Sequence, residues 1–93
     1  MSVEHVNGKD IGNVMLYALS TCGWCRKTRQ LLNDLGVAYD FTYVDLLTGQ
    51  ERTDVVSVVR KWNPDSSFPT LVIDNKKCII GFQEDAIRQS LKK

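Results

Sequence analysis

The chain contains 93 residues, of which 43% are hydrophobic and 25% are charged, and its formal net charge is +1. This composition is typical of one compact domain and argues against a disordered tail. A nearly neutral chain has no overall field to hold a nucleic acid backbone or an anionic membrane surface, and no apolar run approaches the ~20 residues that cross a bilayer. We therefore expect one domain over residues 1–93 that acts as a monomer, without nucleic acid or membrane partners.

The core of this domain is predicted to lie in residues 14–92, with residues 1–13 as an N-terminal extension. The extension is polar and lacks the apolar stretch of an export signal. We expect a cytoplasmic, reducing location, although a mature secreted chain would look the same. Three cysteines are an odd number, which argues against a disulfide framework. Cys22 and Cys25 are separated by two residues, a spacing that in a reducing compartment indicates redox chemistry or metal binding.

The first half of the core is predicted to form a strand, a helix and a second strand. Residues 14–19 are a short apolar run typical of a buried strand. From Cys25 onward, leucines recur at helical spacing until Gly36, which is a plausible helix end. Residues 39–45 alternate, with aromatic side chains on one face, and predict the second strand.

The second half is predicted to form a helix, a hairpin and a final helix. Residues 48–50 open the first of these helices, although its many valines make a strand the competing interpretation. Its predicted apolar face consists of Val55, Val56, Val58, Val59 and Trp62. After a loop, residues 70–73 and 78–80 form the hairpin around a tight turn, and residues 84–93 form the final helix.

The predicted order is therefore β-α-β-α-β-β-α. A right-handed crossover makes the first two strands parallel, and the hairpin adds antiparallel strands. This order predicts an α/β fold: a mixed four-stranded sheet with helices on both faces.

The segment Thr21-Cys22-Gly23-Trp24-Cys25 lies between the first strand and the first helix. Cys22 would stand at the first helical turn, where unpaired N–H groups and the helix dipole favour a thiolate. Cys25 would lie one turn deeper on the same side, within reach of Cys22. Cys22 can then attack a substrate disulfide, and Cys25 can attack Cys22 to release the reduced product.

The Cys-x-x-Cys motif at a strand–helix junction, with Ser67-Phe68-Pro69-Thr70 opening a hairpin, resembles the thioredoxin superfamily. The short N-terminus and seven elements resemble its glutaredoxin branch, and the ending Gly81–Ile87 is similar to that of the NrdH-redoxins. This resemblance implies a thioredoxin-like fold and a dithiol–disulfide oxidoreductase, with Cys22 as the nucleophile and Cys25 as the resolving thiol. It also implies a cis-proline at Pro69, which leaves the Phe68 backbone free to pair with an extended substrate segment.

Several further residues are candidates for substrate or glutathione binding. Trp24 and Phe82 are aromatic residues expected beside the cysteines, as partner contacts or as ordinary packing. Arg26 adds positive potential or belongs to a solvated helix face. Glu84 and Asp85 could meet a glutathione ammonium group, or they could serve as acidic residues at a helix start.

The sequence departs from typical glutaredoxins between the cysteines, where Gly23-Trp24 replaces their Pro-Tyr dipeptide, so the resemblance leaves the reductant open. Glutathione or a thioredoxin-reductase-type donor would supply electrons, and proteins containing disulfides would be the clients, with ribonucleotide reductase as one candidate by resemblance. We expect no tightly bound cofactor and no metal, with glutathione as a co-substrate. The alternative is a glutaredoxin-like protein that carries an iron–sulfur cluster through Cys22. A zinc site would need two more ligands, and only Cys78 and His5 remain; Cys78 is expected to be a small buried hydrophobe.

Overall fold

The computed structural model describes residues 3–91. Within this range the chain forms a five-stranded sheet, three α-helices and one short 3-10 helix. In chain order the elements are β1 (Glu4–Val6), β2 (Val14–Ala18), α1 (Gly23–Leu35), β3 (Tyr39–Tyr43), η1 (Val44–Leu46), α2 (Gly49–Trp62), β4 (Thr70–Ile73), β5 (Lys77–Ile80) and α3 (Glu84–Ser90).

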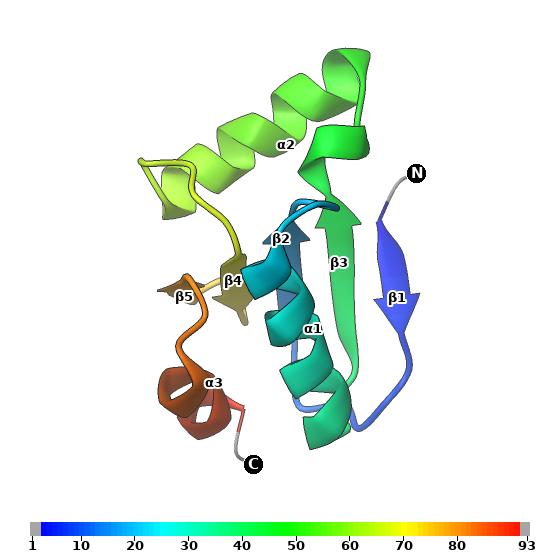
Figure 1. Cartoon of the computed structure of the whole chain (residues 1–93), viewed down its shortest axis with the longest axis vertical. Coiled ribbons are helices and arrows are strands. Elements are labelled where there is room, and N and C mark those ends of the chain that lie inside the picture. The colour runs from blue at the N-terminus through cyan, green and yellow to red at the C-terminus, as the bar shows by residue number, and fades with distance from the viewer. Residues whose placement is uncertain (1–2, 92–93) are drawn as a thin grey trace.

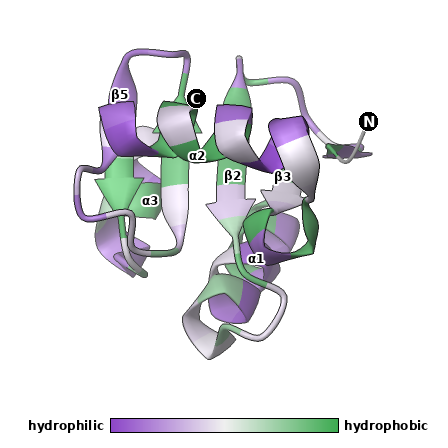
Figure 2. Ribbon diagram, turned by 90° about the horizontal axis from the view of Figure 1, so that it is seen from above, coloured by the Kyte–Doolittle hydropathy of each residue, from purple (hydrophilic) through white to green (hydrophobic). Residues whose placement is uncertain are grey.

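The strands are arranged in the order β1-β3-β2-β4-β5. Strands β2 and β3 are parallel and joined through α1, whereas all other neighbours are antiparallel. Helices α1 and α3 cover one face of the sheet, and α2 lies on the other face (Figures 1 and 2). The predicted α/β class, the mixed sheet and the helices on both faces are confirmed.

The sheet has one strand more than predicted. Strand β1 pairs with β3 in the register Glu4↔Phe41 and Val6↔Tyr39, within the segment that we predicted to be an N-terminal extension outside the core. The sequence does not show this strand because it is a mostly exposed edge strand of three residues, too short for an alternating pattern. His5 Nδ1 and Asp40 Oδ1, 2.6 Å apart, add a side-chain contact between the two strands.

Helix α1 ends where its sequence predicts, but its N-cap is not one of the residue types that cap best. Its N-cap is Cys22, although Ser20 and Thr21 are the better capping types. Leu31 and Leu32 are buried against the sheet. The helix ends at Gly36, which has a φ of 69° and donates its N–H to the Asn33 carbonyl, as predicted for this position.

Helix α2 is present, and its apolar face is narrower than predicted. Val59 is buried and Val55, Val56 and Trp62 are half-buried, but Val58 is 36% exposed. The reason is that α2 meets the rest of the fold mainly at β4 and η1, so that one row of its side chains reaches the core.

The hairpin and the last helix close the fold. Asp74 and Asn75 both have positive φ values, 55° and 53°, as the tight turn between β4 and β5 requires. Helix α3 buries Ile87, and Leu91 follows at its C-cap. The predicted helix extended to residue 93, but residues 92 and 93 lie outside the described range.

Candidate functional site

Cys22 occupies the junction between β2 and α1. It is the N-cap of α1, with extended backbone angles of φ −93° and ψ 117°, and its Sγ accepts a hydrogen bond from the Cys25 N–H at 3.2 Å. The side chain is half-buried, so that part of its surface stays open to solvent. A sulfur that replaces the usual capping oxygen is placed where N–H groups and the helix dipole favour a negative charge.

Cys25 lies directly behind Cys22 and is 1% exposed. Burial, followed by a hydrogen bond to the Cys22 side chain, raises the pKa of the Cys25 thiol to about 12. Both cysteines are free thiols in this structure. The structure thus brings together the pair that the spacing predicted and distinguishes them: one sulfur is accessible, and the other is buried and holds its proton.

The loop before β4 contributes to the same hydrophobic cluster as this pair. Its peptide bond between Phe68 and Pro69 is cis, as the resemblance implied, and Pro69 is buried. Phe68 is half-buried and packs against the same core cluster as Cys22 and Phe82. The pairing of the Phe68 backbone with an extended substrate segment stays a prediction.

Asn63 holds this loop in place, a role that the sequence did not reveal. Its side chain, 1% exposed, donates hydrogen bonds to the Ser67 carbonyl at 2.9 Å and to the Thr70 hydroxyl at 3.2 Å. Its amide oxygen accepts the Asp65 N–H at 3.2 Å. In the sequence, residues 63–67 look like an ordinary polar loop. The hydrogen bonds that Asn63 makes within it leave no periodic pattern by which they could be predicted.

Trp24 and Phe82 form an aromatic pair beside the cysteines. The rings are stacked with centroids 5.9 Å apart, and Trp24 is 59% exposed. Lys27 Nζ lies 4.8 Å from the centroid of the Trp24 ring. Glu84 and Asp85 are exposed in the first turn of α3, which matches their reading as helix-start acids.

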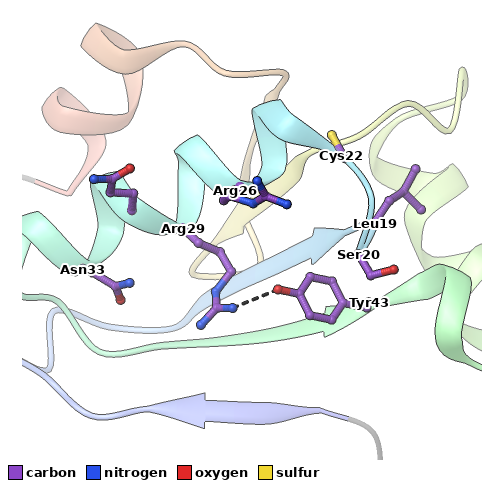
Figure 3. Close-up of a pocket in the computed structure, with 8 residues that line it drawn as sticks. Leu19, Ser20, Cys22, Arg26, Arg29, Asn33 and Tyr43 are labelled. Atoms are coloured by element: carbon purple, nitrogen blue, oxygen red, sulfur yellow. Dashed lines mark hydrogen bonds between the residues drawn. The ribbon is translucent and has the colours of Figure 1, made fainter.

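A second surface lies on the other flank of α1. The residues that line this groove, hereafter the arginine groove, are Leu19, Ser20, Cys22, Arg26, Arg29, Gln30, Asn33 and Tyr43. Figure 3 shows Cys22 at one end, Asn33 at the other and the two arginines between them. The predicted binding residues are therefore divided: Arg26 shares the arginine groove with Cys22, whereas Phe82 and Glu84 line a neighbouring depression, and Gln30 borders both.

Arg29 was not among the predicted site residues, yet it is the best-anchored cation in the arginine groove. Its guanidinium lies 3.8 Å from the centroid of the Phe41 ring and donates to the Tyr43 hydroxyl at 2.9 Å and the Tyr39 hydroxyl at 3.3 Å. Burial opposes its charge, but the two tyrosine hydrogen bonds outweigh burial and raise the pKa of Arg29. The alternating aromatics of β3 were recognised in the sequence, but not the cation that they hold.

Within residues 3–91 no three His, Cys, Asp or Glu side chains are grouped so that they could hold a metal ion. No helix in the same range is long and apolar enough to cross a bilayer. Cys78, in β5, is half-buried rather than fully buried, and burial raises the pKa of its thiol.

A thioredoxin-like fold with a Cys-x-x-Cys pair at the start of its first helix defines the chain as a member of the thioredoxin superfamily. The glutaredoxin family model matches residues 14–79. The crystal structure of the glutaredoxin from Methanosarcina mazei has 50% sequence identity and a TM-score of 0.92, over 100% of this chain and 90% of that chain. Methanoredoxin from Methanosarcina acetivorans has 44% identity and a TM-score of 0.89, over 92% of this chain and 90% of that one.

A relative known from its sequence agrees with these structures. The Gene 56 protein of Mycobacterium phage D29 is 36% identical over 74 residues, which are 80% of this chain and 77% of the phage protein. The chain belongs to the glutaredoxin family.

Proposed function

We propose that the protein is a dithiol–disulfide oxidoreductase that reduces disulfides in client proteins or mixed disulfides with glutathione. The observation that carries this proposal is the contrast between its two adjacent thiols. Cys22 is accessible at the helix N-cap, whereas Cys25 is buried and its pKa is raised to about 12. A nucleophile has to reach the substrate, but a resolving thiol has to reach only the nucleophile.

The reaction proceeds in two exchanges. The Cys22 thiolate attacks one sulfur of the substrate disulfide, the new S–S bond replaces the old one, and the other sulfur leaves as a thiolate that takes a proton from solvent. Cys25 then loses its proton and attacks Cys22, which forms the Cys22–Cys25 disulfide and releases the second substrate sulfur. The substrate gains two electrons, the protein loses them, and a thiol reductant restores the free thiols.

Two surfaces beside Cys22 suit different parts of a substrate. The exposed Trp24–Phe82 pair suits a protein client, since rigid aromatic side chains are common anchors in protein interfaces. The arginine groove suits an anionic group, such as a carboxylate of glutathione, because Arg26 and Arg29 present guanidinium donors there. Glu84 already pairs with Arg88 at 2.9 Å, so we assign a substrate ammonium to Asp85 instead.

The test of the catalytic assignment is the turnover of a disulfide substrate by serine variants. Cys22→Ser should abolish reduction, since the serine hydroxyl does not replace a thiolate nucleophile. Cys78→Ser is the matched control and should retain the wild-type rate, because Cys78 lies in β5 outside the proposed site. Appreciable turnover by Cys22→Ser would remove Cys22 from the nucleophile role.

The reductant is identified by a direct comparison. We propose glutathione or a thioredoxin-reductase-type enzyme as the electron donor, in the cytoplasm, where free thiols persist. The oxidised protein should be reduced rapidly by one of these two systems and slowly by the other. Failure of both systems to reduce the Cys22–Cys25 disulfide would contradict this part of the proposal.

The iron–sulfur alternative has its own signature. A cluster ligated by Cys22 of two chains would make the purified protein coloured and dimeric, whereas the proposed oxidoreductase is colourless and monomeric. The position of Cys25 favours the oxidoreductase. Its buried thiol is hydrogen-bonded to the Cys22 side chain, so the two sulfurs are close enough to form a disulfide.

A further inference from the structure

Asp45 lies beside the loop that carries Cys22, although it is distant in the sequence. Strands β2 and β3 are parallel with Ala18 opposite Tyr43, so their carboxyl ends meet at the same edge of the sheet. Beyond this edge one Asp45 carboxylate oxygen accepts the Ser20 N–H at 2.9 Å, and the other accepts the Ser20 hydroxyl at 2.5 Å. Two bonds from one carboxylate to one residue fix both the position and the orientation of that residue.

Leu19, which precedes Ser20, is hydrogen-bonded to both cysteines. The Cys22 N–H donates to the Leu19 carbonyl at 3.2 Å, which closes a tight turn over residues 19–22. The Leu19 backbone is also hydrogen-bonded to the Cys25 side chain. The segment that Asp45 holds through Ser20 therefore carries the attacking sulfur and contacts the resolving one.

We propose that Asp45 is a positioning residue for the thiol–disulfide exchange, which acts through Ser20 to hold the Leu19–Cys22 turn so that Cys25 can attack Cys22. The inference rests on the proposed function. The step that it serves is the second exchange: the Cys25 sulfur, having lost its proton to solvent, bonds to the Cys22 sulfur. The bond from Cys22 to the substrate breaks, and the electron pair leaves with the substrate sulfur, which takes a proton from solvent.

The charge of Asp45 and its hydrogen bonds act in opposite directions on this step, which makes the two effects separable. The negative charge of Asp45 disfavours the Cys25 thiolate, and Arg52 is the cation that faces Asp45 from α2. Asp45→Asn removes the charge but also one of the two acceptors, since an amide NH2 group accepts no hydrogen bond. Ser20→Ala keeps the charge and removes only the hydroxyl bond.

The experiment measures the two exchanges separately in single-turnover reactions with dithiodipyridine, in a Cys78→Ser background. Each exchange releases one coloured thiol, first when Cys22 forms the mixed disulfide and then when Cys25 displaces it. Ser20→Ala and Asp45→Asn should each slow the second phase about tenfold and leave the first phase nearly unchanged. Ser20→Thr, which restores a hydroxyl, should recover the wild-type second phase.

The matched control is Asp54→Asn, which removes another exposed carboxylate that accepts a hydrogen bond, from Gln50 on α2. It should leave both phases at wild-type rates. A faster second phase in Asp45→Asn, with Ser20→Ala unchanged, would show that Asp45 acts through charge alone and would overturn the proposal. Lower thermal stability with unchanged rates would overturn it as well. Because the probe is a reagent rather than a physiological disulfide, these results stay distinct from a failure of the proposed function.

Discussion

At the residue scale, the site depends on an unequal environment for two chemically identical thiols. Cys22 caps the helix at its accessible end, whereas the Cys25 side chain is enclosed. The Cys25 backbone N–H donates to the Cys22 sulfur at 3.2 Å. Desolvation and the neighbouring Cys22 sulfur keep the proton on Cys25. A protonated thiol is a poor nucleophile, so Cys25 does not compete with Cys22 for the substrate disulfide. The different roles proposed for the two cysteines, nucleophile and resolving thiol, therefore follow from their burial rather than from their residue type.

The raised pKa of Cys25 predicts how stability depends on pH. The folded state keeps the Cys25 proton up to about pH 12, whereas the unfolded chain loses it near the ordinary value of 9.0. The resulting stabilisation is complete below pH 9.0 and is lost as the pH rises toward about 12. Denaturant unfolding of the reduced protein should show this loss.

The comparison that isolates Cys25 uses Cys78→Ser and the double variant with Cys25→Ser, because burial also raises the pKa of Cys78. The single variant should lose stability over this pH range, and the double variant should lose less, because it lacks the thiol responsible. Equal slopes of stability against pH would show that the Cys25 pKa is not raised by folding.

A second prediction at this scale concerns Asn63. Asn63→Ala should lower the free energy of unfolding by about 2 kcal/mol, because it leaves buried partners in the loop without their hydrogen bonds. Equilibrium unfolding measures the change, and Asn7→Ala, at an exposed position, is the control. A loss below about 0.5 kcal/mol, the level of ordinary surface changes, would mean that the loop holds its shape without Asn63.

At the scale of the elements, α2 shows how limited the contact between a helix and the core can be. Val59 is 1% exposed, and its neighbour Val58 is 36% exposed, so the helix contributes to stability through few side chains. The same limited contact explains why the predicted apolar face was too broad. An apolar side chain on a helix indicates an inward face only where a packed element lies opposite it.

The pair of valines provides a matched test. Val59→Ala removes two buried methyl groups and should lower the free energy of unfolding by about 2 kcal/mol. Val58→Ala should change it by less than about 0.5 kcal/mol, because that side chain is already partly in solvent. Thermal or denaturant unfolding compares the two, and equal losses would mean that α2 packs with a different face inward.

At the scale of the whole molecule, the order of the elements and the position of the cysteines followed from local patterns. The apolar run of β2, the glycine at the end of α1 and the hairpin turn each produce a signal within a few residues. Strand β1 produced none, because three mostly exposed residues have no periodicity. Its pairing with β3 is decided by the sheet, not by its own sequence.

Two of the contacts that were missed in the site share one cause. Asp45 reaches Ser20 and Arg29 reaches Tyr43 across the fold, so that each contact joins residues far apart in the chain. The parallel arrangement of β2 and β3 could have indicated the first contact, since residues that follow the carboxyl ends of parallel neighbours lie close together. No comparable signal pointed to Asn63, whose role becomes visible only once the loop is folded.

The central claim, that Cys22 attacks the substrate and Cys25 resolves the product, is tested most directly by trapping the intermediate. Cys25→Ser, incubated with a disulfide substrate and analysed by mass spectrometry of its peptides, should accumulate a mixed disulfide on Cys22. Wild-type protein treated in the same way should show the Cys22–Cys25 disulfide instead. An adduct on Cys78, or no adduct at all, would contradict the account.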